Sequence, residues 1–132
     1  MNTFWSLLIA VVAVVLVQTI FFPKGVTMNV PDLKKKWNPE VKAKGETILV
    51  DVREPAEFAA GHVPGAINIP LGQIETRSDE LKSGKTLFVI CQAGGRSAKA
   101  CGILGPKFPE KVVINVAGGT GAWIGAGFPV EK

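Results

Sequence analysis

The sequence predicts an α/β fold with a small, mostly parallel central sheet flanked by helices and preceded by one transmembrane helix. Three continuous apolar runs, residues 47–52, 86–91 and 111–116, are typical of short strands that are buried on both faces. Segments of helical composition separate these runs, and strands that alternate with helices indicate a parallel sheet. A fourth apolar run, residues 4–22, precedes them and contains no charged residue.

This uncharged run is long enough to cross a bilayer. As a helix it would span roughly 28 Å, close to the hydrocarbon thickness of about 30 Å. A cleaved secretory signal is the competing interpretation, but no lysine or arginine precedes the run, and Phe21 and Phe22 stand where a signal has small residues. A buried core helix would normally keep a polar face. We therefore expect a retained anchor over residues 1–23 and one domain over residues 24–132.

The lysines predict the orientation of this anchor and the partners of the domain. None precedes the apolar run, whereas several follow it closely: Lys24, Lys34, Lys35, Lys36 and Lys42. The positive-inside tendency then places the domain in the cytoplasm, at a bacterial inner membrane, with the opposite side left open. These lysines could contact anionic lipid headgroups. Although the net charge is +4, no aromatic residues are interleaved with the basic ones, so nucleic acid is not expected as a partner.

The first half of the domain begins with an expected strand around residues 27–30. A helix should follow with Pro31 at its first position and end before Pro39, because proline fits the first turn and cannot continue a helix. The later elements expected here are a strand at residues 47–52, a short helix at 54–61 with Gly61 at its end, a short strand at 66–70 and a polar helix at 74–82.

The second half repeats the strand-to-helix pattern twice. The run at residues 86–91 is a strand, and the segment 95–104 continues as a helix that Pro106 and Pro109 are expected to cut short. The next strand is residues 111–116. A glycine-rich turn and a short helix close the domain, and we expect Trp123 to pack in the core.

Cys91 stands where the second buried strand turns into a helix, the place where parallel sheets bind ligands. Gly94 and Gly95 permit positive φ angles, so successive N–H groups can point inward and bind an anion. The helix amino terminus would lower the pKa of the thiol and make Cys91 a candidate nucleophile, and the guanidinium of Arg96 could complete the anion site. The alternative is that Cys91 is a small core residue beside ordinary turn glycines.

Three blocks of the chain together resemble the signature of the rhodanese family. Residues 51–71 contain an aspartate–arginine strand end, a short acidic and aromatic helix, a glycine–histidine pair and a turn with glycine, alanine and asparagine. Residues 91–97 are similar to the active-site loop of the family, and residues 117–130 are similar to its carboxyl-terminal motif. The blocks stand in the order of the family and extend over about residues 26–130.

The resemblance implies a sulfurtransferase with a rhodanese-like fold and without a metal or organic cofactor. Cys91 would attack the outer sulfur of thiosulfate or a related anionic donor, release sulfite, and pass the persulfide sulfur to cyanide or a thiol. The resemblance also implies an anion-binding loop, which comprises Gln92, Ala93, Gly94, Gly95, Arg96 and Ser97.

Loop length separates this chemistry from that of related phosphatases. Only four residues lie between Cys91 and Arg96, whereas the loop of the dual-specificity phosphatases is one residue longer. A phosphatase-like or arsenate-reducing enzyme stays open as an alternative, as does a membrane-tethered persulfide carrier without free turnover. Gln92 and Ala93 are uncharged where some thiosulfate-preferring relatives carry basic residues, which leaves the donor open.

Other polar residues have structural roles as their simplest interpretation. His62 resembles a turn residue of the family that bonds locally. Asp51, Arg53 and Glu54 are expected to form an ion-pair cluster near the site. Cys101 should face the core, although it could also resolve an oxidised Cys91 as a disulfide. Two cysteines and one histidine are too few for a zinc site.

Overall fold

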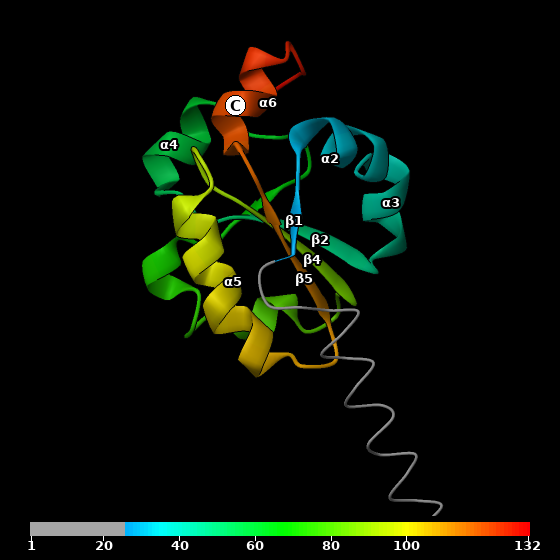
Figure 1. Ribbon diagram of the computed structural model, residues 1–132, viewed down its shortest axis with the longest axis vertical. Coiled ribbons are helices and arrows are strands. Elements are labelled where there is room, and N and C mark those ends of the chain that lie inside the picture. Colours follow the sequence, from blue (N-terminus) through cyan, green and yellow to red (C-terminus); the bar gives the residue numbers. More distant parts are fainter. Residues whose placement is uncertain (1–25) are drawn as a thin grey trace, which may run out of the picture.

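The computed structural model describes residues 26–132, which form an α/β domain around one five-stranded sheet (Figure 1). The strand order is β1-β5-β4-β2-β3 and every pair is parallel, as predicted. The strands are β1 (Thr27–Met28), β2 (Thr47–Asp51), β3 (Ile67–Asn68), β4 (Thr86–Ile90) and β5 (Val112–Val116).

The predicted anchor, residues 1–23, lies outside the described residues. Within residues 26–132, no helix combines the length and the apolarity that crossing a membrane requires.

Helices cover both faces of the sheet (Figure 1). They are α2 (Val30–Lys36), α3 (Pro39–Lys44), α4 (Pro55–Ala60), α5 (Gly95–Lys107) and α6 (Gly119–Gly125), with two 3₁₀ turns, η1 (Leu71–Gln73) and η2 (Ser78–Leu81). Helices α2, α3 and α6 pack on one face, whereas α5 and the segment that contains η1 and η2 pack on the other.

Strand β4 lies in the middle of the sheet and supplies side chains to both cores. Phe88 and Ile90 belong to the cluster under α2 and α6, and Leu87 and Val89 belong to the cluster under α5. This alternation follows from the two-residue period of a strand. Cys91 continues the second set, which places its side chain beside the start of α5.

An asparagine caps the amino terminus of each of the first two helices, and Asn38 lies between them. The side chain of Asn29 accepts the N–H of Asp32, and that of Asn38 accepts the N–H of Val41, each at 2.9 Å. Each asparagine precedes a helix with proline in its first turn. The first helix ends before Pro39 as predicted, and the second helix was not predicted.

The prediction of a polar helix over residues 74–82 is wrong. Residues 74–77 form a turn and residues 78–81 form η2, because hydroxyls of the segment bond to nearby carbonyls in place of a helical ladder. The hydroxyl of Thr76 donates to the carbonyl of Gln73 at 3.2 Å, and that of Ser78 donates to Glu75 at 3.0 Å.

The expectation that Pro106 cuts the next helix short is also wrong, since α5 runs through it to Lys107. Pro106 removes one bond, the one to the carbonyl of Gly102, and both residues are exposed on the outer side of the helix. Beyond it, the N–H of Phe108 still donates to the carbonyl of Leu104 at 2.9 Å, and both of these side chains are buried. Core packing thus holds the last turn.

Candidate active site

The Cys91 loop comprises residues 91–97 and connects β4 to α5. Gly94 precedes the helix with a φ of 114°, a left-handed conformation that favours glycine. Gly95 is the first residue of α5 and has no positive φ, so only one of the two predicted glycine conformations occurs. This single left-handed residue turns the backbone so that N–H groups of the loop face the sulfur of Cys91.

The sulfur of Cys91 lies at the bottom of this loop with 1% of the residue exposed. The N–H of Gly94 donates to Sγ at 3.0 Å, and Ser97 Oγ lies 3.2 Å from Sγ. Burial raises the pKa of the thiol, but bonds from the hydroxyl and N–H of Ser97 and the N–H groups of Gly94 and Ala93 outweigh it. The net result is a pKa below the ordinary value of a cysteine, which increases the thiolate population at neutral pH.

A second glycine-rich turn, residues 117–121, supports the Cys91 loop from behind. The N–H of Thr120 donates to the carbonyl of Cys91 at 2.8 Å, and that of Gly121 donates to Gln92 at 3.0 Å. Gly119 has a φ of 60°, and a Cβ there would lie 2.6 Å from the carbonyl oxygen of Gln92. Gly119 is therefore needed for the two turns to approach each other. Sequence reasoning assigned these glycines to a turn and did not predict this contact.

Asn115, at the end of β5, is a second residue that sequence reasoning missed. Its Oδ1 lies 2.5 Å from Ser97 Oγ, and its Nδ2 donates to the carbonyl of Gly94 at 3.3 Å. The Ser97 hydroxyl has one proton, so Asn115 Oδ1 and the sulfur of Cys91 compete for it. Asn115 thus contacts the loop at two points and influences which way the hydroxyl points.

Arg96 is bound to a carboxylate on a neighbouring helix. Its Nη1 and Nη2 donate to Oε1 and Oε2 of Glu57 at 2.7 and 2.9 Å, an arrangement that joins the first turn of α5 to α4. The hydrogen bond from Arg96 lowers the pKa of Glu57 to about 2. Sequence reasoning did not predict this pair, because Glu57 lies 39 residues before Arg96.

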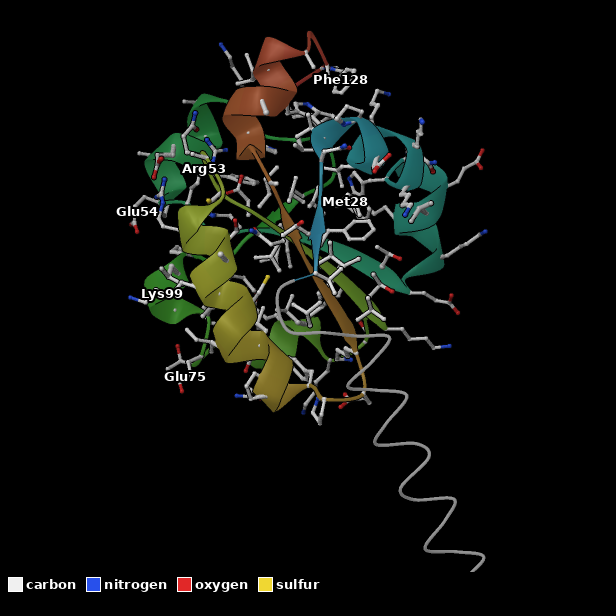
Figure 2. The ribbon with its side chains drawn as sticks, in the orientation of Figure 1. Met28, Arg53, Glu54, Glu75, Lys99 and Phe128 are labelled. Atoms are coloured by element: carbon white, nitrogen blue, oxygen red, sulfur yellow. The ribbon has the colours of Figure 1, made fainter. Side chains whose placement is uncertain are left out.

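Asp51 and Arg53 form the expected ion pair, which is buried behind the loop. Arg53 Nη2 lies 2.9 Å from Asp51 Oδ2, and the same nitrogen donates to the carbonyl of Gly61 at 2.9 Å. Arg53 Nη1 also lies 3.4 Å from Oε1 of Gln92. Glu54 is not part of this pair: it precedes α4 and is exposed (Figure 2).

The contacts of His62 and Cys101 indicate structural roles for both residues. His62 Nδ1 is 2.8 Å from the carbonyl of Phe58, and the two rings stack with centroids 3.6 Å apart. Cys101 packs against the core under α5, where burial raises the pKa of its thiol to about 12. Trp123 is buried, as expected, and its indole N–H donates to the carbonyl of Pro129 at 2.7 Å.

A pocket of about 420 Å³ lies away from the Cys91 loop, between α2, α3 and the carboxyl-terminal segment. Its walls include Trp37, Lys42, Trp123 and Glu131, and no residue of the Cys91 loop lines it. At the Cys91 loop, N–H and hydroxyl donors instead surround one buried sulfur. In the described part of the chain, no three metal-ligating side chains gather at either place.

The geometry of the Cys91 loop suits nucleophilic chemistry at sulfur. It combines an activated thiol with N–H and hydroxyl donors that can stabilise a negatively charged sulfur. Of the predicted loop residues, Ala93, Gly94 and Ser97 bond to the sulfur of Cys91. Gln92 is exposed, Gly95 begins α5, and the guanidinium of Arg96 is paired with Glu57.

Comparisons with known proteins identify the family of this chain. The model of the rhodanese-like domain matches residues 34–126. A protein of Bacillus subtilis named "Putative sulfur carrier protein YrkF" is 34% identical over 74% of this chain and 52% of its own length. A protein of Allochromatium vinosum named "Sulfurtransferase" is 35% identical over 64% of this chain and 78% of its own length.

The crystal structure of a rhodanese-related protein from Thermoplasma volcanium superimposes with a TM-score of 0.66. It is 32% identical in sequence, and the alignment covers 80% of this chain and 97% of that chain. The chain thus spans about half the length of YrkF and nearly all of the Thermoplasma protein. From the family match, the fold and the cysteine loop together, this chain belongs to the rhodanese-like domain family.

Proposed function

We propose that this protein is a sulfurtransferase that moves sulfane sulfur from an anionic donor to a thiophilic acceptor through a persulfide on Cys91. The observation that carries the proposal is the sulfur of Cys91, which is held 3.0 Å from the N–H of Gly94 and 3.2 Å from Ser97 Oγ. These donors favour the thiolate, and they could equally stabilise the terminal sulfur of a persulfide.

The first half-reaction loads the sulfur. With thiosulfate, the thiolate of Cys91 attacks the outer sulfur, a new S–S bond forms, and the S–S bond of the donor breaks. Sulfite leaves with the electron pair of that bond. In the second half-reaction, cyanide or a thiolate attacks the terminal sulfur of the persulfide, and the Cys91 thiolate is released.

Persulfide formation provides the direct test. We expect intact mass measurement to detect one added sulfur atom after incubation with a sulfane donor, and the addition should disappear on treatment with a thiol. Cys91→Ala should abolish it, whereas Cys101→Ala, the matched control, should retain it. Loading that survives in Cys91→Ala would overturn the mechanism.

A persulfide carrier is the second candidate, because the relative YrkF is named a sulfur carrier. A carrier would load Cys91 in the same way and release the sulfur only to a partner protein. Turnover separates the two functions: the enzyme releases many equivalents of sulfite in the presence of cyanide, whereas the carrier stops after one. A phosphatase or arsenate reductase has less support, since the loop is short and Arg96 is bound to Glu57.

We also propose that residues 1–23 anchor the domain to a bacterial inner membrane with the catalytic domain in the cytoplasm. The support is the uncharged run at residues 4–22 and the lysines that follow it. The full chain should remain with membranes after alkaline carbonate washing, and a chain that starts at residue 24 should not. A carboxyl-terminal reporter that is active only in the cytoplasm tests the side.

A further inference from the structure

We propose that Glu57 selects the sulfur donor: by pairing with Arg96, it disfavours the dianion thiosulfate and favours organic persulfides, R–S–SH. This inference rests on the sulfurtransferase function proposed above. It concerns which molecule loads Cys91, so it can fail while that function stands.

Arg96 in the Cys91 loop and Arg53 beside Gln92 are both already paired with carboxylates. Arg53 is bound to Asp51 in the buried pair, and Arg96 is bound to Glu57 through two hydrogen bonds. Each pair has no net charge. A dianion that approaches the sulfur therefore meets paired charges and must either displace the Glu57 carboxylate or lie beside it.

The Glu57 carboxylate is held in place from two directions. Besides the bonds to Arg96, its Oε1 accepts the N–H of Glu54 at 3.2 Å in the first turn of α4. These bonds keep the pKa of Glu57 at about 2, so the group is ionised throughout the pH range of an assay. A donor that needs the guanidinium must compete with a bidentate, permanently charged neighbour.

The remaining groups around the sulfur suit a donor of low charge. Gln92 and Ala93 are exposed and uncharged. The donors that reach Sγ are N–H and hydroxyl groups, which can bind one anionic sulfur without a counterion. The sulfonate end of thiosulfate adds charged oxygens beyond the one sulfur that these donors bind, whereas an organic persulfide adds a substituent that can be neutral.

The loading step balances with a persulfide donor. The Cys91 thiolate attacks the outer sulfur of R–S–SH, the new S–S bond forms, and the S–S bond of the donor breaks. The thiolate R–S⁻ leaves with the electron pair, and the proton stays on the transferred sulfur. No external oxidant or reductant is required.

The test compares two donors in single-turnover loading, with persulfide formation on Cys91 followed by quenched intact mass. The donors are thiosulfate and the persulfide of 2-mercaptoethanol, which has a neutral substituent. Glu57→Gln keeps the size and the hydrogen-bonding oxygen but removes the charge. Glu54→Gln is the matched control, because it removes the same charge from the start of the same helix and no bond joins Glu54 to Arg96.

Glu57→Gln should raise the second-order rate constant for thiosulfate by about tenfold, since one negative charge is removed and the charge of Arg96 is no longer neutralised by an ion pair. The rate with the persulfide of 2-mercaptoethanol should change by less than about twofold, because its reacting form, R–S–SH, has no charge for Glu57 to repel. Glu54→Gln should change neither rate. The thiosulfate gain should shrink in the double variant Glu57→Gln/Arg96→Gln.

An unchanged thiosulfate rate in Glu57→Gln, with normal loading by the neutral persulfide, would overturn the role of Glu57 and leave the sulfurtransferase function intact. Equal gains with both donors would also overturn it, because they would indicate a general opening of the loop. Loading of Cys91→Ala by either donor would overturn the underlying function instead.

Discussion

The two cysteines of this protein lie ten residues apart and pack against the same core, yet the pKa values of their thiols are shifted in opposite directions. Cys91 precedes α5, where hydrogen bonds bring its pKa below the ordinary value, and Cys101 lies within α5, where burial raises its pKa to about 12. Cys91 is buried and Cys101 is only partly buried, yet Cys91 has the lower pKa, so burial alone does not decide reactivity. The difference comes from N–H and hydroxyl groups that point at one sulfur.

These donors are available at Cys91 because of its place relative to the helix. The first N–H groups of a helix have no carbonyl partner within it, and the Gly94 conformation turns loop N–H groups toward the same point. At Cys101 the N–H groups of α5 belong to the helix interior, where they bond to carbonyls one turn earlier. The same residue type is therefore a nucleophile at one position and a core residue at the other.

Gly119→Ala should reduce the difference in reactivity between Cys91 and Cys101 most, because it disturbs the turn that supports the Cys91 loop. The added Cβ would lie 2.6 Å from the Gln92 carbonyl oxygen, and the φ of 60° disfavours a side chain. We expect loss of about 2 kcal/mol of stability from this strain. Displacement of the sulfur by about 1 Å would slow persulfide loading about a hundredfold.

Thermal unfolding and single-turnover loading check this prediction. Gly125→Ala is the matched control, since it lies in the same helix and a Cβ there meets nothing within 4 Å. It should leave loading unchanged and the stability equal or slightly higher. Equal behaviour of the two variants would show that the support from α6 is unimportant.

Cys91 should react with iodoacetamide at pH 7 at least roughly fiftyfold faster than Cys101. The pKa of Cys101 is about 12 and that of Cys91 lies below 9.0. The thiolate populations thus differ by at least about a thousandfold, and the greater intrinsic nucleophilicity of the more basic thiolate recovers about twentyfold. Peptide mapping after timed quenching measures both rates in one sample; comparable rates would contradict the opposite pKa shifts.

Ser97→Ala should reduce the difference in alkylation rate between Cys91 and Cys101 by a smaller amount. It removes a hydroxyl that stabilises the Cys91 thiolate, so the pKa of Cys91 rises and the alkylation curve moves to higher pH. Because Asn115 competes for the same proton, we expect only about a fivefold slower reaction at pH 7. At a pH well above both pKa values the two proteins should react at similar rates, which distinguishes a pKa effect from a blocked site.

Cys101→Ala should have the smallest effect. The side chain packs against the core under α5, so its truncation should cost about 1 kcal/mol of stability. The pH midpoint for alkylation of Cys91 should not move, because a thiol with a pKa of about 12 is neutral in that range. A shifted midpoint in this variant, or a Cys91–Cys101 disulfide in the wild-type protein after peroxide treatment, would support the redox interpretation.

Sequence patterns predicted best those elements whose residues share one environment. The strands β2, β4 and β5 are continuous apolar runs because helices cover both faces of the sheet. Helix α3 was missed because none of its residues is buried, which leaves no apolar period to detect. The helix expected over residues 74–82 is not formed because the hydroxyls of Thr76 and Ser78 bond to the carbonyls of Gln73 and Glu75, a competition that apolar patterning does not report.

The sequence by itself determined the strand–loop–helix unit at Cys91, because a buried run, a cysteine, adjacent glycines and a helical segment are local in the chain. It also determined the family, through three blocks in a fixed order. Only the tertiary structure decided what surrounds that unit. Glu57 reaches Arg96, Asn115 reaches Ser97 and Gly119 touches Gln92 through the packing of separate elements, and local patterning does not encode such contacts between distant residues.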